Sequence, residues 1–181
     1  MKHINLNPMN PPLNWQDKLP DELPQGWNER AAALCQAQSL TAALRALGGS
    51  FAVKVLYMGE LDGQGNPFGE NHAETAAPQF VRDVLLHLDG VPVVQARSAC
   101  GLQSQAWRGV LDCGTQPLGE RLFDGTLPLK RSAFEFCLME NAGGQDDFRR
   151  PVAARRSYFD WDGEVLELTE YFLPGLARIM R

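Results

Sequence analysis

The chain of 181 residues lacks several features that would place a protein in a class at once. No stretch approaches the roughly 18 consecutive apolar residues of a membrane-spanning helix. The N-terminal segment MKHINLNPMNPPLNW is broken by prolines and has no apolar signal region. Acidic residues (22) outnumber basic ones (17), and the net charge of −5 argues against a general nucleic-acid-binding surface. We therefore expect a cytoplasmic protein with no membrane span and no nucleic-acid partner.

Residues that carry metal or nucleophilic chemistry are scarce. The three histidines are scattered, and no Ser/His/Asp order or nucleophile elbow is present. The cysteines form no CxxC pair and have no histidine at zinc spacing. We expect no metal site, and we expect reduced, mostly buried thiols at all four cysteine positions: Cys35, Cys100, Cys113 and Cys137.

The composition is that of one globular domain with an appendage, since 44% of residues are apolar and 22% charged. Residues 1–27 are rich in proline and asparagine and indicate an irregular N-terminal arm. Residues 28–181 are expected to form a single domain. Residues 28–47 have a helical pattern that Ser39 divides if it acts as a second N-cap. Strands are expected at 51–57 and 134–139, a short helix at 103–112, and loops at 61–77 and 141–151.

A β-hairpin is predicted over residues 80–98, FVRDVLLHLDGVPVVQARS. Asp89-Gly90 is a strong signal for a two-residue type I′ turn. An unbroken register from that turn pairs Leu88 with Val91 and Arg82 with Arg97. Arg82 then shares a face with the apolar side chains of its strand, and two like charges lie opposite each other. Something anionic is therefore expected near the two arginines.

A second hairpin is predicted near the end of the chain, with Asp162-Gly163 as its turn. Its register pairs Arg155 with Glu170, a carboxylate on an otherwise apolar strand face. Two hairpins, two further strands and early helices indicate an α+β fold. We expect a single antiparallel sheet of about six strands with helices covering one face.

The three charged residues on apolar faces, Arg82, Arg97 and Glu170, allow two interpretations. Arginine binds carboxylates through two parallel hydrogen bonds, and a glutamate accepts a hydroxyl hydrogen bond, so the set suits a small hydroxylated acid. Alternatively they form an internal ion-pair network, with Glu170 bound by Arg155 or Arg97 and with Arg82 bound by Asp83 or Glu120. The residue pattern alone leaves both open.

Several short motifs resemble those of the chorismate–pyruvate lyase family and occur in the same order. The resemblance covers most of residues 39–174, and the motifs together are specific although each is weak alone. They are Ser39-Leu40-Thr41, VRDVLLHLDG from Val81, Ala96-Arg97-Ser98, Pro117-Leu118-Gly119 with Leu122-Phe123, Arg155-Arg156-Ser157 and TEYFLP from Thr169.

The resemblance implies a lyase that converts chorismate to 4-hydroxybenzoate and pyruvate, the first committed step toward the ubiquinone ring. It also implies an internal ligand site beneath helical flaps and no cofactor. We expect chorismate and 4-hydroxybenzoate as the small-molecule partners, and a monomer.

Site roles follow from the resemblance, position by position. Arg82 would bind the ring carboxylate, Glu170 would reach the ring hydroxyl end, and backbone groups of Leu40 and Leu118 would complete the substrate contacts. Arg97 matches the second arginine of the family, so Arg82, Arg97 and Glu170 are the expected catalytic residues. The alternative is a non-catalytic module of the same fold that senses a small aromatic acid.

Overall fold

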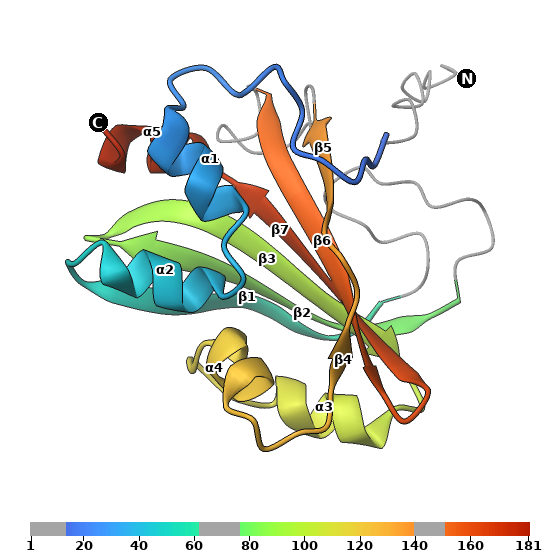
Figure 1. Cartoon of the computed structure of the whole chain (residues 1–181). Helices are drawn as coiled ribbons and strands as arrows, with labels where there is room; N and C mark the ends of the chain where they lie inside the picture. Colours follow the sequence, from blue (N-terminus) through green and yellow to red (C-terminus); the bar gives the residue numbers. More distant parts are fainter. Residues whose placement is uncertain (1–13, 62–76, 140–150) are drawn as a thin grey trace, which may run out of the picture.

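A computed structural model describes residues 14–61, 77–139 and 151–181 (Figure 1). The helices are α1 (Glu29–Cys35), α2 (Leu40–Ala46), α3 (Gln105–Leu111), α4 (Leu118–Phe123) and α5 (Pro174–Ile179). The strands are β1 (Phe51–Leu61), β2 (Gln79–Leu88), β3 (Val91–Gly101), β4 (Lys130–Arg131), β5 (Glu135–Met139), β6 (Val152–Trp161) and β7 (Glu164–Phe172). The expected loops at 61–77 and 141–151 lie almost entirely outside the described residues.

The fold is α+β, with one antiparallel sheet, as expected. In the described residues the sheet has seven strands in the order β1-β2-β3-β7-β6-β4, and β5 also pairs with β6. The count exceeds the expected six because β4, only two residues long, pairs with Asp160 and Phe159 of β6. Strands β3 and β7 lie at the centre of the sheet, so their inward side chains are shielded on both sides by neighbouring strands.

Capping residues divide the first helical segment in two, as the position of Ser39 suggested. The Asn28 side chain accepts a hydrogen bond from the N–H of Ala31 at the start of α1. The Ser39 side chain accepts one from the N–H of Ala42 at the start of α2. Each side-chain oxygen satisfies an N–H that has no acceptor within its helix. The break between the helices lets α2 begin directly over the sheet.

Both hairpin turns form where the sequence placed them. Asp89 and Asp162 have φ values of 50° and 51°, and the glycine after each is also in the left-handed region, as a type I′ turn requires. In the second hairpin the expected register is confirmed, including the pairing of Arg155 with Glu170.

The expected register of the first hairpin is wrong beyond its second pair. His87 pairs with Pro92, but Leu86 pairs with Val94, so Val93 is the extra residue of a β-bulge. Proline has no N–H to donate to the ladder, which makes the strand irregular at this point. The bulge exchanges the faces of β3 relative to β2: Arg82 lies opposite Ser98, and Arg97 lies opposite Asp83.

The helices and the main hydrophobic core lie on one face of the sheet. In Figure 1, α2 lies in front of the β1–β3 end, α1 lies above it near α5, and α3 and α4 lie below. Side chains from these helices and from α5 join one cluster with inward residues of the strands; its largest fully buried members include Trp107, Phe159, Phe172, Leu44 and Leu111. Among the described residues no helix is both long and apolar enough to cross a membrane.

The described part of the N-terminal arm contacts the body of the protein. Gln16 forms a bridge with Phe136, and the Trp15 ring stacks under the guanidinium of Arg156 at 4.3 Å. Trp27 packs edge-on against Phe172, with ring centroids 5.9 Å apart. The two tryptophans therefore anchor the arm to opposite faces of the sheet, because Arg156 and Phe172 lie on opposite sides of it.

Gly175 is expected to be sensitive to a single added methyl group. A Cβ at this position would lie 2.1 Å from the backbone oxygen of Pro92, so α5 would have to move away from β3. Gly175→Ala should lower the free energy of unfolding by about 1–3 kcal/mol, measured by urea unfolding. The matched control is Gly109→Ala in α3, where a Cβ meets nothing within 4 Å. That variant should gain about 0.5–1 kcal/mol, as alanine does over glycine inside helices. Equal effects would contradict the described packing of α5.

Candidate functional site

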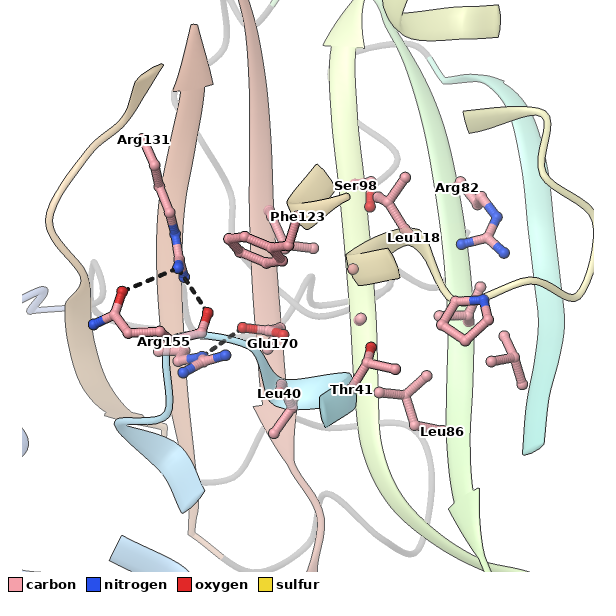
Figure 2. Close-up of a pocket in the computed structure, with 17 residues that line it drawn as sticks. Leu40, Thr41, Arg82, Leu86, Ser98, Leu118, Phe123, Arg131, Arg155 and Glu170 are labelled. Atoms are coloured by element: carbon pink, nitrogen blue, oxygen red, sulfur yellow. Dashed lines mark hydrogen bonds and ion pairs between the residues drawn. The ribbon is translucent and has the colours of Figure 1, made fainter. Parts of the chain in front are cut away.

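A cavity lies between the sheet and the two helices α2 and α4 (Figure 2). Its walls are mostly apolar, with charged groups at its ends. The residues that line it are Gln38, Leu40, Thr41, Val53, Arg82, Val84, Leu86, Ala96, Ser98, Pro117, Leu118, Gly119, Phe123, Arg131, Arg155, Leu168 and Glu170. Concave, largely apolar sites with a few polar groups are the usual form of small-molecule sites.

Small side chains on the central strand β3 form the floor of this cavity. Ala96 lies between Val84 of β2 and Glu170 of β7, and Ser98 lies between Arg82 and Leu168. A larger residue at either position would fill the space between the flanking side chains. The strand pairing therefore places Arg82 of β2 and Glu170 of β7 on either side of β3, whose side chains in the cavity are small.

Arg82 occupies one end of the cavity and is 2% exposed. Its Nη2 donates hydrogen bonds to the backbone oxygens of Gly114 (2.7 Å) and Gln116 (3.2 Å). Its buried Nε has no hydrogen-bond partner in the described residues. No carboxylate there pairs with this guanidinium, and burial lowers the pKa of Arg82. A buried cation with an unused N–H group has the chemistry that binding an anion requires.

Glu170 and Arg155 form a buried ion pair toward the other end of the cavity. Arg155 Nε donates to Glu170 Oε2 at 2.5 Å, and the two side chains are 1% and 7% exposed. Arg155 Nη1 also donates to the backbone oxygens of Cys35 (2.9 Å) and Ala37 (2.6 Å). The pair holds the Glu170 carboxylate in a fixed position, which leaves its other oxygen to face the cavity.

Arg131 is a further cation at the Glu170 end, and the sequence analysis did not single it out. Its guanidinium lies over the ring of Phe134 at 4.0 Å, and 5.2 and 5.3 Å from the ring centroids of Phe123 and Phe159. Burial lowers its pKa to about 10, so it remains protonated at neutral pH. The sequence near Arg131 does not mark it, because one of its rings, Phe159, comes from the distant β6–β7 hairpin.

Helices α2 and α4 form the roof and touch each other above the cavity. A Cβ on Gly119 would lie 2.8 Å from the Thr41 hydroxyl oxygen, so glycine permits this approach. An exposed ion pair between Arg45 and Glu120, 2.8 Å long, joins the helices on their outer side. The cavity is narrow, with a volume of about 40 Å³. A ring-sized ligand would therefore require the roof to move.

Of the site residues inferred from the sequence, the structure brings together four and separates one. Arg82, Glu170, Leu40 and Leu118 all line the cavity, and the last two are the first residues of the roof helices. Arg97 does not line it. Its Nε and Nη2 donate to the two oxygens of Asp83 at 2.8 and 2.7 Å, on the opposite face of the sheet. The expectation that Arg82 and Arg97 point at each other is wrong, because the bulge at Val93 exchanges their faces.

Both interpretations of the charged residues are therefore partly realised. Glu170 pairs with Arg155, as the ion-pair network required, whereas Arg82 pairs with neither Asp83 nor Glu120 in the described residues. All four cysteines are buried thiols. Burial raises the pKa of the Cys35 thiol to about 12 and that of Cys100 to about 11, so neither is a nucleophile at neutral pH. In the described ranges, no three His, Cys, Asp or Glu side chains group closely enough to hold a metal ion.

Two solved structures have a low similarity to this chain. PhnF from Mycobacterium smegmatis is 17% identical, with a TM-score of 0.49, over 76% of this chain and 64% of that chain. The C-terminal domain of the histidine utilization repressor from Pseudomonas syringae pv. tomato is 14% identical, with a TM-score of 0.45, over 69% of this chain and 92% of that chain. At these values the two structures say nothing about the activity of this chain.

Sequence comparisons are far more specific. A protein described as a probable chorismate pyruvate-lyase from Ralstonia nicotianae is 33% identical over 179 residues, covering 90% of each chain. One of the same description from Shewanella amazonensis is 35% identical over 171 residues, covering 88% of this chain and 83% of that protein. The family model described as Chorismate lyase matches residues 15–180. With that match over nearly its whole length, and with Arg82 and Glu170 in one cavity, the chain belongs to the chorismate lyase family.

Proposed function

We propose that this protein converts chorismate to 4-hydroxybenzoate and pyruvate, with the ring bound in the cavity between the sheet and the roof helices. The observation that carries the proposal is Arg82: a buried cation that has no carboxylate partner in the described residues and lines an apolar cavity with Glu170. Membership of the chorismate lyase family supplies the substrate class. In this family the product is the precursor of the ubiquinone ring, and we extend that pathway role to this chain.

Arg82 would bind the carboxylate on C1 of the ring. Its Nη2 is held by two backbone oxygens, so the unused Nε lies on a guanidinium that is already oriented. The N-cap residue of α4, Pro117, provides no side-chain hydrogen bond, so the N–H groups of Leu118 and Gly119 have no acceptor within the helix. One such N–H would add a second donor to the same carboxylate, as Leu118 does by resemblance to the family.

Glu170 would act at the other side of the ring. The reaction breaks the bond between C3 and the ether oxygen and removes the hydrogen on C4. The ring becomes aromatic, and the released enolpyruvate takes up a proton at its methylene carbon to give pyruvate. Glu170 would accept a hydrogen bond from the C4 hydroxyl and stabilise the charge that develops there, while the backbone of Leu40 lies beside it. No oxidation or reduction occurs, so the reaction needs no redox cofactor.

The roof would exclude water once the ligand is bound. Oriented binding and a dry site strengthen the contacts to both ends of the ring. The aromatic product keeps the ring carboxylate and the hydroxyl, and therefore keeps the contacts with Arg82 and Glu170. We expect slow product release and inhibition by 4-hydroxybenzoate as consequences.

Turnover of chorismate is the direct test. Purified protein should release 4-hydroxybenzoate and pyruvate in equal amounts, the first measured by its absorbance and the second by a coupled lactate dehydrogenase assay. Binding of 4-hydroxybenzoate without turnover would reject the lyase and support the sensing module instead.

Replacing Arg82 should abolish tight ligand binding. Arg82→Gln removes the charge opposite the ring carboxylate and should weaken 4-hydroxybenzoate binding at least about tenfold, measured by calorimetry. Arg178→Gln, on the exposed last turn of α5, is the matched control and should bind normally. Unchanged affinity of the Arg82 variant would place the ligand elsewhere.

Replacing Glu170 should affect turnover more than product binding. Glu170→Gln keeps an acceptor for Arg155 but loses the charge, so kcat should fall at least about tenfold while the Kd of 4-hydroxybenzoate changes less. Glu167→Gln, on the other face of the same strand, controls for a carboxylate lost from β7. Equal losses in kcat and product affinity would argue that Glu170 only binds the ring.

A further inference from the structure

Chorismate has a second carboxylate, and the structure leaves Arg97 unable to bind it. Arg97 is paired with Asp83 on the far face of the sheet. The enolpyruvyl group is attached at C3, next to the hydroxylated C4, so its carboxylate would lie toward the Glu170 end when the ring carboxylate is on Arg82. Two cations line the cavity at that end, Arg131 and Arg155.

The charge of Arg155 is already neutralised by the Glu170 carboxylate. Its Nε is bound to the Glu170 carboxylate and its Nη1 to two backbone oxygens, with the side chain only 1% exposed. Binding a second carboxylate would compete with the ion pair that positions Glu170. Arg155 is therefore a structural cation within the cavity wall.

Arg131 has capacity left for an anion. Its Nη1 donates to the backbone oxygen of Gln38 at 2.8 Å, and its Nε to the Ser157 hydroxyl at 3.3 Å. In the described part of the chain its Nη2 makes no hydrogen bond, and no carboxylate forms an ion pair with it. Its hydrogen-bond partners are neutral acceptors, and the charges of Arg155 and Glu170, which also act on its pKa, belong to a pair whose members already neutralise each other.

The rings around Arg131 hold the guanidinium without neutralising it. Phe134 lies against its face, and Phe123 and Phe159 flank it. Aromatic faces attract a cation but supply no hydrogen-bond acceptor, so the outward N–H groups stay available. Arg131 is partly buried beside these rings, and partial burial strengthens a contact between this cation and an incoming carboxylate.

Figure 2 shows the placement that such a contact needs. Arg82 lies at one end of the cavity, and Arg131, Arg155 and Glu170 gather at the other. The charged residues of the lining are three arginines and one glutamate, a formal charge of +2. A ligand with two carboxylates balances this charge, whereas 4-hydroxybenzoate with its single carboxylate does not.

We propose that Arg131 binds the enolpyruvyl carboxylate of chorismate, which makes it the residue that distinguishes the substrate from the product. The proposal rests on the proposed function and adds a ligand contact to it. Arg131 orients the leaving group beside Glu170, and after cleavage it retains pyruvate, not the aromatic ring.

The test compares ligands that differ only in the second carboxylate. The stable mimic 3-(carboxymethoxy)-4-hydroxybenzoate carries an ether-linked carboxylate at the substituted position, and 3-methoxy-4-hydroxybenzoate carries the ether alone. In the unaltered protein the first should bind more tightly. Arg131→Gln should lower its affinity about 10- to 100-fold, as expected for a lost charge-assisted contact. The same variant should bind 3-methoxy-4-hydroxybenzoate and 4-hydroxybenzoate within about twofold of the unaltered protein.

Kinetics supply the second readout. Arg131→Gln should raise the KM for chorismate and lower kcat/KM about 10- to 100-fold, and Arg131→Lys should recover part of the loss because it keeps the charge. Arg156→Gln is the matched control, since Arg156 is also stacked on aromatic rings but lies on the other face of the sheet. It should leave kcat/KM within about twofold.

Two results would overturn the proposal. One is an equal loss of affinity for all three ligands in Arg131→Gln, which would mean that Arg131 only supports the cavity wall. The other is an unchanged affinity for the dicarboxylate. These outcomes differ from failure of the proposed function, in which the unaltered protein would release no 4-hydroxybenzoate from chorismate.

Discussion

The guanidinium of Arg155 joins three parts of this molecule: the strands β6 and β7 and the segment between α1 and α2. It holds Glu170 across the β6–β7 hairpin, and it binds the backbone oxygens of Cys35 and Ala37 in the turn that leads into α2. A buried arginine is costly unless its donors are satisfied, and here a carboxylate and two carbonyl groups satisfy them. The same contacts fix the start of the roof helix above the strand that carries the candidate catalytic carboxylate. The position of the roof and the position of Glu170 therefore depend on one side chain.

The arginines near this cavity differ in what holds them, and that difference decides what each can do. Arg155 is neutralised by a carboxylate and serves the framework. Arg82 is held by backbone oxygens and Arg131 by aromatic rings, so both keep their positive charge for a ligand. Arg97 has its own carboxylate, Asp83, on the other face of the sheet. A protein with a net charge of −5 thus concentrates positive charge at the two ends of one cavity.

Much of this arrangement could be predicted from local signals. The two Asp-Gly turns, the N-caps at Asn28 and Ser39 and the pairing of Arg155 with Glu170 all follow from short-range rules, and the structure has them. The face of Arg97 could not be predicted by counting from the turn, although Pro92 in the strand was a sign of irregular pairing. Arg131 was missed for a different reason: it is defined by rings from three separate segments. Only the folded chain brings Phe123, Phe134 and Phe159 around it.

The bulge at Val93 has a consequence for the cavity as a whole. Strands β1 and β2 form one half of the sheet, and β3, β7 and β6 form the other, with regular pairing from Val94 to Cys100 across β3 and β7. The bulge lies between these halves and determines which side chains of one half share a face with those of the other. Arg82 belongs to the first half and Glu170 to the second, so a ligand that touches both bridges the two. A one-residue insertion or deletion here would affect many side chains at once. It would turn the side chains of one half of the cavity lining to the opposite face of the sheet relative to the other half.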